Sequence, residues 1–520
     1  MTKKTFFAQG LILTGISFFL RITNIVYRSY LTQKVGTQGI GLYQLILSIF
    51  MLAVTLSTSG ISLAVTRMVT AEIVAGRRSR IRSVVSRCFA FCLSISVSIS
   101  LILYFASDFC ARVLLGNEAA APCLRILGVG LPFMSISTCL KGYFLAVDES
   151  VATGISDMLE NMLTIGMTVF FFWYFAPQGI EKACMAAVAA STVGEMASFG
   201  VGWLAYRRSL RRNTPAAAEK GSGVLHGLAH IALPCTLSSA ARSLLNTGEN
   251  LLIPKELQKF GQSYAVSMSQ YGLLQGMTMP MLYFPSSFLS SFASLLIPKI
   301  TREREQNHKK AVEYITGKAI SAALLFGIFF AAIFVAFGHE WSQVFYHNDF
   351  AGEYLRVLAP LVPLMYLDVV VDCLLKGMDE QFNSMKFNLA DSSLRVLLVL
   401  LLLRFWGIES YVGILFFSTI FNASLSLGRL LKVTNVKMRF TEQILLPVLS
   451  GMLSVSVSKL VTAKIWQTAS MVSIFAQILL AGAIFLGVLG GISLLTRERQ
   501  REAPSTTQNP RLRAHSTEKI

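Results

Sequence analysis

The sequence predicts an all-α membrane protein of about fourteen transmembrane helices, built as two six-helix lobes related by a parallel repeat and followed by two C-terminal helices. Three observations lead to this fold class: the composition, the spacing of the apolar stretches, and an internal repeat. Of the 520 residues, 53% are apolar and only 14% are charged, far below the roughly 25% charged residues of soluble domains. The mean hydropathy is +0.58. We therefore expect lipid to be the solvent of this chain.

Apolar stretches of about 20 residues recur from near the N-terminus to residue 496, and each has the length that crosses roughly 30 Å of hydrocarbon. They are continuously apolar, whereas strands of a membrane barrel would be about ten residues long and would alternate between apolar and polar residues. Helices are therefore favoured. The predicted spans are residues 6–31, 40–65, 86–107, 121–146, 154–176, 183–206, 228–253, 266–297, 313–338, 354–377, 384–406, 409–431, 442–463 and 468–495.

The connections between spans alternate in charge. Basic connections follow the second, sixth, eighth and twelfth spans, at residues 67–87, 207–220, 299–310 and 429–439, whereas the opposite connections hold few Lys or Arg. The positive-inside rule makes the basic connections cytoplasmic, and an even number of spans places both termini there too. The expected location is a bacterial cytoplasmic membrane. Because the basic residues that produce the net charge of +18 lie between the spans, nucleic acid is not an expected partner.

The same connections divide the chain into parts. Residues 1–206 are expected to form an N-terminal lobe of six spans, 207–227 a cytoplasmic linker, and 228–431 a C-terminal lobe of six spans. Residues 432–496 would add the thirteenth and fourteenth spans, which pack on one half or extend a lipid-facing groove. Residues 497–520 are polar, basic and Pro-containing, and they predict a disordered cytoplasmic tail.

An internal repeat relates the two lobes. The fourth span and its flanks align without a gap with the tenth at an offset of 231 residues, where Leu124, Arg125, Leu127, Pro132, Met134, Asp148 and Glu149 match Leu355, Arg356, Leu358, Pro363, Met365, Asp379 and Glu380. Because an even number of spans separates the copies, the repeat axis is expected to lie along the membrane normal, with the halves facing each other across a central cavity.

Polar stripes in the first and seventh spans are the candidate substrate-binding residues. Arg21 and Arg28 are two helical turns apart, with Asn24 between them, and Arg242 and Asn246 form a similar stripe in the counterpart span. Guanidinium groups stay charged when desolvated and bind phosphate in a bidentate manner, so they predict an anionic cargo. The alternative is that the first-span arginines lie near the interface and snorkel, or pair with buried acids.

Acidic residues inside the spans are the candidate ion-coupling groups. Glu160 in the fifth span and Asp391 in the eleventh occupy matching repeat positions, and Glu249 lies on the stripe of the seventh span. A charge at the bilayer centre costs at least about 2.5 kcal/mol, so each acid needs a partner or a water-filled cavity. An acid left unpaired would suit Na⁺ or H⁺ coupling, and the alternative is an ion pair such as Asp391 with Arg395, four residues further on.

No catalytic chemistry is evident in the sequence. There is no Walker A motif, Gly-rich phosphate loop, catalytic triad or HExxH, and the eight cysteines lack CxxC spacing. We therefore expect no enzyme activity, no metal site and no cofactor, with transport driven by Na⁺, by H⁺ or by the membrane potential.

Two stretches resemble a known family. RITNIVYRSYLTQKVGTQGIGLYQLILSIFMLAVTLSTSGISLAVTRMV (21–69) and YGLLQGMTMPMLYFPSSFLSSFASLLIPKI (271–300) resemble the stage V sporulation protein B and polysaccharide transporter family of the multidrug, oligosaccharidyl-lipid and polysaccharide exporter superfamily, which is related to lipid II flippases. The resemblance implies two lobes, alternating access, and export of an undecaprenyl-linked glycan such as a peptidoglycan, spore-cortex or polysaccharide precursor. It also implies that Arg28 faces the cavity and is important for function, and that Arg21 follows it.

The chain departs from the lipid II flippases in one respect that bears on the cargo. Their second span carries an arginine, whereas the span from Gly41 to Ala64 has no charged residue. Other anionic lipid-linked sugars therefore stay open. The expected partners are the lipid-linked glycan, membrane lipid and cell-wall synthesis enzymes. The alternatives are a cation-coupled multidrug exporter and a non-transporting structural component of a cell-wall or sporulation complex.

Overall fold

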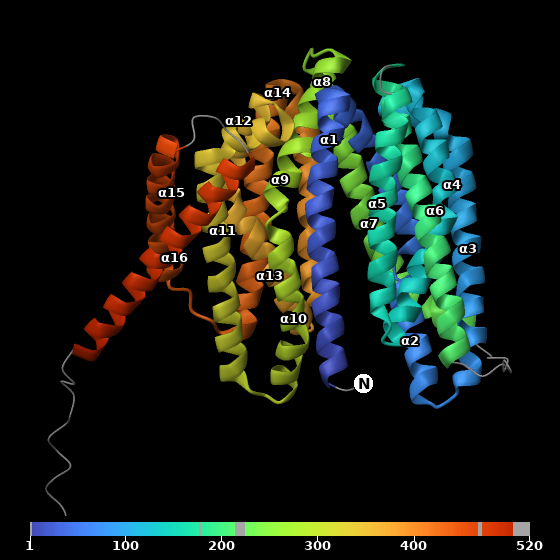
Figure 1. The fold of residues 1–520 in the computed structure, drawn as a ribbon, viewed down its shortest axis with the longest axis horizontal. Helices are drawn as coiled ribbons and strands as arrows, with labels where there is room; N and C mark the ends of the chain where they lie inside the picture. The colour runs from blue at the N-terminus through green and yellow to red at the C-terminus, as the bar shows by residue number, and fades with distance from the viewer. Residues whose placement is uncertain (1–2, 176–177, 214–223, 466–470, 503–520) are drawn as a thin grey trace, which may run out of the picture.

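The computed structural model describes residues 3–175, 178–213, 224–465 and 471–502. These residues form a bundle of long helices that are joined by short connections at both ends of the bundle (Figure 1). These described residues contain helices and turns and no strand. The predicted all-α membrane fold is confirmed.

The first lobe comprises the first six predicted spans. Its helices are α1 (Lys3–Thr58), α2 (Ile61–Val74), α3 (Arg78–Phe109), the π-helix η1 (Cys110–Leu115), the 3₁₀ turn η2 (Glu118–Ala120), α4 (Ala121–Ala146), α5 (Ser150–Phe175) and α6 (Ile180–Asn213). Gly36, with φ 73° and ψ 179°, breaks α1 into two spans that run in opposite directions. Only glycine adopts this backbone conformation readily, so the hairpin depends on it.

The second lobe comprises the next six spans. Its helices are α7 (Val224–Lys259), α8 (Tyr264–Tyr271), the π-helix η4 (Gly272–Thr278), α9 (Met279–Tyr283), α10 (Ser286–Glu305), α11 (Lys309–Tyr346), α12 (Asp349–Leu358), the 3₁₀ turn η5 (Ala359–Leu361), α13 (Val362–Gly377) and α14 (Gln381–Thr434). Gly407 divides α14 in the way that Gly36 divides α1. The segments on either side of Pro285 are bent by 51°, so the eighth span is a broken helix.

The C-terminal pair consists of η6 (Thr441–Leu445), α15 (Leu446–Ile465) and α16 (Met471–Glu502), which pack on each other and on α11 at the edge of the second lobe (Figure 1). Ten described helical stretches are long and apolar enough to cross a membrane, and the bent pair makes eleven. Two of the ten contain the glycine kinks, and α7 adds a 36-residue helix that is not among them. The described helices thus accommodate the fourteen predicted spans.

Two boundaries differ from the sequence prediction. The basic stretch from Arg207 continues helix α6 to Asn213, and α7 begins at Val224, so the expected linker is shorter and its centre lies outside the described residues. Likewise α16 continues to Glu502, and the rest of the expected tail lies outside the described residues.

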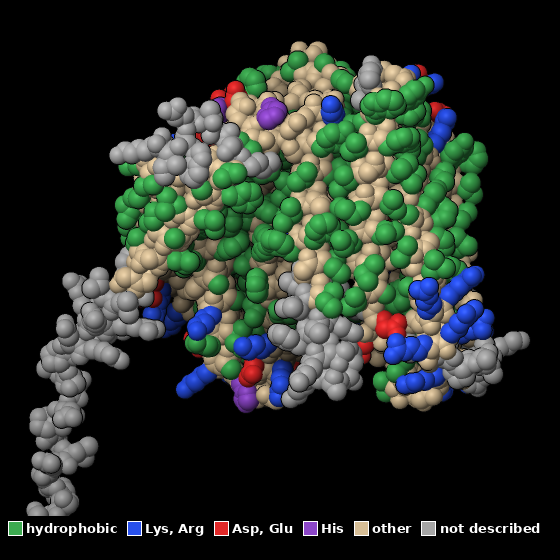
Figure 2. All heavy atoms as spheres, in the orientation of Figure 1, with side chains coloured by type: hydrophobic (Ala, Val, Ile, Leu, Met, Phe, Trp, Pro, Cys, Tyr) green, Lys and Arg blue, Asp and Glu red, His purple; other side chains and the backbone are tan. Residues whose placement is uncertain are grey.

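Lys and Arg side chains gather at one end of the bundle, which is called the basic end here and is the lower end in Figure 2. The α2–α3 and α10–α11 turns lie at this end, whereas α8 and α12 lie at the opposite end (Figure 1). This distribution reproduces the charge alternation of the sequence.

The internal repeat is visible in the backbone of the turns. Left-handed residues occur at pairs separated by the offset of 231: Gly76 (φ 70°) and Asn307 (φ 56°), Gly116 (φ 65°) and His347 (φ 51°), and Asp148 and Asp379 (both φ 59°). Directly after the second pair, the side chains of Asn117 and Asn348 each cap the following helix by accepting a backbone N–H hydrogen bond. The copies therefore share turn geometry as well as sequence.

The hydrophobic core divides toward the basic end. One large buried cluster includes residues of both lobes, such as Leu45, Leu124, Phe334 and Tyr366. A second cluster is built mainly around Val85 and Tyr143 of the first lobe, and a third belongs to the second lobe. The large cluster thus joins the lobes through the middle and the end opposite to the basic end. Toward the basic end the two smaller clusters are separate, and only α7 of the second lobe, through Leu228 and Ala232, joins the hydrophobic cluster of the first lobe.

Glycines bring the lobes together at the joined end. A Cβ placed on Gly41 would lie 2.2 Å from the carbonyl oxygen of Met268, and a Cβ on Gly272 would lie 2.1 Å from the carbonyl oxygen of Thr37. The hydroxyl oxygens of Thr37 and Ser269 are 2.5 Å apart. This contact of residues 37–41 with residues 268–272 is called the interlobe contact below. It depends on glycine because any larger residue places a carbon against the facing backbone.

Candidate functional site

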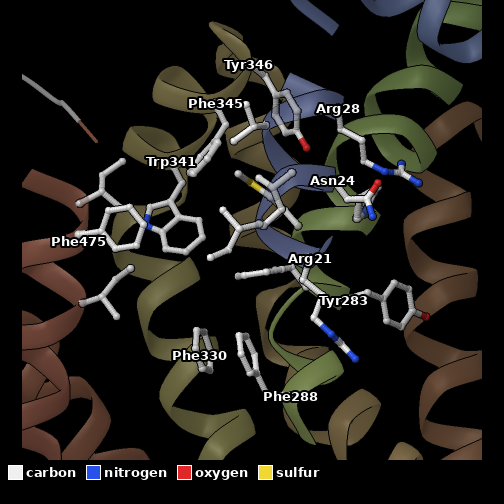
Figure 3. A pocket seen from close by; sticks show the side chains of 18 of the residues that line it. Arg21, Asn24, Arg28, Tyr283, Phe288, Phe330, Trp341, Phe345, Tyr346 and Phe475 are labelled. Atoms are coloured by element: carbon white, nitrogen blue, oxygen red, sulfur yellow. The ribbon is translucent and has the colours of Figure 1, made fainter. Parts of the chain in front are cut away.

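A cavity of about 760 Å³ opens beside the first half of α1. Its walls come from α1, the broken eighth span, α11 and α16, so both lobes and the C-terminal pair contribute to it (Figure 3). A volume of this size is within the range of roughly 300–1,000 Å³ that ligand pockets occupy. It is the candidate substrate site.

Arg21, Asn24 and Arg28 line this cavity, as the first-span stripe predicts (Figure 3). Arg21 donates from Nη2 to the Ser291 hydroxyl at 3.4 Å, which links α1 to α10. Asn24 accepts a hydrogen bond from Asn161 of α5 at 3.2 Å, so the same face of α1 also contacts the first lobe. Among the described residues, neither arginine of the cavity has a carboxylate within ion-pair distance.

Aromatic and aliphatic side chains form the rest of the cavity wall. Figure 3 shows Trp341 and Phe475 on the side away from Arg28, with Phe288 and Phe330 below. The indole Nε1 of Trp341 is buried and has no hydrogen-bond partner in the described structure. The cavity thus combines a polar side, which carries two guanidinium groups, with an apolar side and one free N–H donor.

The stripe of the seventh span lies elsewhere. Arg242 and Asn246 are on α7 but are not among the residues that line this cavity. Arg242 is exposed and interacts electrostatically with Asp368 of α13, and the side-chain oxygen of Asn246 is buried without a hydrogen-bond partner. The structure therefore does not bring the two predicted stripes together around one cavity.

Glu249 and Asp391, two of the predicted coupling acids, share one cation in the second lobe. Arg395 lies 3.3 Å from Glu249 and 3.6 Å from Asp391, so the expected Asp391–Arg395 pair is present and includes a third member. The Tyr411 hydroxyl donates to Glu249 at 3.2 Å, and the Ser418 hydroxyl donates to Asp391 at 2.6 Å. Both carboxylates are buried, and this second-lobe cluster holds its own countercharge.

Glu160, the third predicted coupling acid, belongs to a polar cluster in the first lobe. Lys141 of α4 lies 2.8 Å from Asp157 of α5. Glu160 interacts electrostatically with Lys141 and with Glu195 of α6, and Ser198 of α6 lies beside it. These five residues are called the first-lobe cluster below.

Sequence reasoning missed the apolar side of the cavity and the contribution of Glu195 to the first-lobe cluster. Trp341 and Phe345 lie near the end of α11, in a stretch whose acids and histidines are its conspicuous feature in the sequence. Phe475 belongs to a helix that has no counterpart in the repeat. The sequence feature that pointed to this side of the cavity was the pair of C-terminal spans without a repeat counterpart, which suggested an extended lipid-facing groove.

Comparisons with known proteins give the family. The model described as "Polysaccharide biosynthesis protein" matches residues 7–302, more than half of the chain. The chain belongs to this family. The model named MatE matches residues 261–401, in the second lobe. The resemblance read from the two sequence stretches is confirmed.

Two sporulation proteins of Bacillus subtilis (strain 168) are similar to this chain. Stage V sporulation protein B is 27% identical over 388 residues, which are 73% of this chain and 74% of that protein. Sporulation protein YkvU is 22% identical over 358 residues, which are 68% of this chain and 78% of that protein.

Solved structures agree on the fold. The lipid II flippase MurJ in an inward closed conformation has a TM-score of 0.70 at 12% identity and covers 94% of this chain and 100% of that one. An inward-facing multidrug resistance MATE transporter of the MOP superfamily has a TM-score of 0.62 at 15% identity and covers 82% of this chain and 99% of that one. This polysaccharide biosynthesis family member therefore has the two-lobe transporter fold.

Proposed function

We propose that this chain is a flippase that moves an undecaprenyl-linked glycan precursor, of peptidoglycan, spore cortex or another polysaccharide, across the cytoplasmic membrane by alternating access. The observation that carries the proposal is the two-sided cavity, where guanidinium groups without carboxylate partners face an apolar wall. An amphiphile with an anionic head fits such a site. The polysaccharide biosynthesis family and the lipid II flippase fold support the same cargo class.

Arg21 and Arg28 would bind the phosphate groups of the cargo. An arginine fork donates two parallel hydrogen bonds to a phosphate, and its charge persists in a site with little water. Because no carboxylate neutralises these two arginines among the described residues, an incoming anion does not have to break an ion pair first. The free indole N–H of Trp341 adds a donor for a phosphate or sugar oxygen.

The apolar wall would hold the first part of the isoprenoid tail. Phe475, Ile478 and Leu479 come from α16, which belongs to neither lobe, so this side of the cavity faces the bilayer beyond the lobes. A tail seated there leaves the protein sideways and stays in lipid. The lobes then need to accommodate only the polar head during transport.

The direction of transport follows from the charge distribution. The positive-inside rule would make the basic end cytoplasmic, and α1 begins at that end (Figure 1). Since the lobes are joined at the other end by the interlobe contact, the head group would enter from the cytoplasmic side and leave outside after that contact opens. Cell-wall synthesis enzymes are then the expected protein partners on either side, and the protein itself performs transport without catalysis.

A second candidate is a cation-coupled multidrug exporter. Two observations favour it: the MatE model matches part of the second lobe, and the cavity has several aromatic rings, which attract organic cations. The two arginines of the cavity oppose this function because they repel a cationic ligand.

Reconstitution into liposomes tests both functions. Vesicles that contain the protein and a fluorescent undecaprenyl-pyrophosphate glycan should show faster loss of inner-leaflet probe than empty vesicles, and cationic dyes should not be transported. Arg28→Ala should abolish flipping, whereas Arg404→Ala, which removes an exposed arginine outside the cavity, should leave it intact. Dye transport without lipid flipping, or normal flipping by the Arg28 variant, would contradict the proposal.

A further inference from the structure

Two glutamines line the large cavity and take no part in the proposed binding of phosphate and tail. Gln44 comes from the second half of α1 and Gln275 from the π-helix η4, so each lobe contributes one. They occupy equivalent positions of the repeat, because GLYQ (41–44) and GLLQ (272–275) align at the same offset of 231 residues as the fourth and tenth spans. A repeat-related pair of side-chain amides therefore borders the cavity.

The interlobe contact determines where this pair lies. Gly41 packs against the carbonyl oxygen of Met268, and Gly272 packs against that of Thr37; positions 37 and 268 are again 231 residues apart. The contact is thus close to two-fold symmetric, because each glycine meets the main chain four residues before the other glycine. Each glutamine follows its own glycine by three residues, which is about one helical turn. The two amides therefore lie one turn away from a shared, symmetric contact.

The Gln44 amide is available to a ligand. A Cβ on Gly276 would lie 3.7 Å from Cγ of Gln44, so this side chain packs across the lobe boundary against the residue that follows Gln275. Gln44 is half-buried, and in the described part of the chain its amide has no hydrogen-bond partner. A polar group without a partner is unfavourable in apolar surroundings. The cavity is the place from which a ligand can supply that partner.

The Gln275 amide is held in place by a chain of hydrogen bonds. Its Nε2 donates to the Tyr411 hydroxyl at 2.8 Å, and this hydroxyl donates to Glu249 at 3.2 Å. Glu249 is paired with Arg395, so the chain ends on a buried ion pair. The carbonyl oxygen of Gln275 and its second N–H are left for a ligand, and the orientation of the amide is fixed before any ligand binds.

Arg28, which also lines the cavity (Figure 3), stands at a similar depth. It precedes the Gly36 kink by eight residues, and Gln44 follows the kink by eight residues on the opposite-running half of α1. At 1.5 Å per residue, both are about 12 Å from the kink. A phosphate bound to Arg28 would therefore place the next group of the head at the level of the two amides.

The chemistry of an amide favours a neutral ligand that both donates and accepts hydrogen bonds. A glutamine side chain has two N–H donors and a carbonyl acceptor, whereas the oxygens of an ionised phosphate only accept. Sugar hydroxyl and acetamido groups donate as well as accept. We propose that Gln44 and Gln275 bind the sugar ring next to the phosphate of the cargo, so that the site selects lipids that carry a sugar. This inference rests on the proposed function and adds to it the residues that recognise the sugar.

Binding measurements on the full-length protein test this selection without a transport assay. One probe is undecaprenyl pyrophosphate that carries N-acetylglucosamine, and the other is its methyl ester, in which a methyl group replaces the sugar while the tail and charge are kept. Native mass spectrometry of titrations in detergent gives both dissociation constants. The wild type should bind the sugar probe at least about 4-fold more tightly, because each of two hydrogen bonds to neutral groups contributes about 2- to 10-fold.

Methionine variants remove the amides and keep an unbranched side chain of similar length. Gln44→Met and Gln275→Met should each reduce the preference for the sugar probe about 2- to 10-fold and leave the affinity for the methyl probe unchanged. Unchanged binding of the methyl probe also shows that the variant is folded. The matched control is Gln38→Met, which changes a half-buried glutamine in the same half of α1 but outside the cavity lining and should alter neither affinity. Arg28→Ala should weaken both probes by the same factor.

The outcomes separate this inference from the proposed function. Equal binding of both probes by the wild type, or a full preference for the sugar in both methionine variants, would overturn the glutamine site while the proposed cargo class stands. Failure of the wild type to bind either probe would overturn the proposed function and this inference with it. If Gln275→Met does not fold because it disturbs Tyr411, Gln44→Met decides the question, since its amide has no protein partner to lose.

Discussion

Replacing Gly272 with alanine should push the lobes apart at the interlobe contact. The added Cβ would lie 2.1 Å from the carbonyl oxygen of Thr37 and 2.8 Å from the backbone nitrogen of Gly41. Both are main-chain atoms of the opposite lobe and cannot turn away as a flexible side chain would. Overpacking of this kind costs about 1–3 kcal/mol.

This penalty arises only when the lobes are joined, so it acts on the conformational equilibrium. A difference of about 1–3 kcal/mol changes the ratio of joined to separated lobes roughly 5- to 150-fold. Alanine is also a better helix former than glycine by roughly 0.5–1 kcal/mol, but that gain is the same in both states and cancels.

Disulfide cross-linking measures the equilibrium. Cysteines at positions 37 and 269, whose native hydroxyl oxygens are 2.5 Å apart, should cross-link almost completely under mild oxidation once the eight native cysteines are replaced. Adding Gly272→Ala should lower the rate of cross-linking, at most by the factor given above. The control is Gly413→Ala, because a Cβ at Gly413 meets no atom within 4 Å. An unchanged cross-linking rate in a folded Gly272→Ala protein would refute the steric reasoning.

Three further predictions concern stability. Arg395→Ala should destabilise the protein by about 3–5 kcal/mol, measured by thermal unfolding in detergent, because it leaves two buried carboxylates without their cation; a loss as small as that of a surface ion pair would contradict the burial of the cluster. Asn117→Ala and Asn348→Ala should each cost about 1 kcal/mol in the same assay, since each removes a helix cap at an equivalent turn, and a much larger loss for one would show that the turns are not equivalent. Hydrogen bonds from Arg429 lower the pKa of Glu380, which lies in a turn. The pair should therefore stabilise the fold above the ordinary glutamate pKa of about 4.3, and this stabilisation should be lost as the pH falls through the lowered pKa. In Glu380→Gln the melting temperature should depend less on pH in this acidic range.

The fold was predictable because membrane helices are specified by length and hydropathy, which need no knowledge of tertiary contacts. The fourth span was predicted at residues 121–146, the bounds of α4, and the repeat at an offset of 231 reappears in the turn conformations. Helix ends were less predictable where charged residues continue the helix beyond the apolar stretch, as Arg207 does in α6. Hydropathy detects where a helix leaves the lipid, and it does not detect where the backbone stops being helical.

The site was predictable only in part. Arginines in the first span stood out because a charge in an apolar stretch is conspicuous, and the structure places Arg21 and Arg28 in the cavity. The apolar wall had no such signal, since one aromatic residue among the 36 phenylalanines of the chain looks like any other. Whether α7 borders the cavity depends on how the lobes pack, and Arg242 is not among the residues that line it. The interaction of Glu160 on α5 with Glu195 on α6 can be known only once the packing of these two helices is known.

The two lobes match in the turns that follow the repeat and differ in their buried charges. Gly116 and His347 have the same left-handed geometry, yet the first-lobe cluster is centred on the ammonium of Lys141 and the second-lobe cluster on the guanidinium of Arg395. Because their buried charges differ, the two lobes are not interchangeable. A chimera made of two copies of the first lobe would hold two lysine-centred clusters and would lose the guanidinium of Arg395.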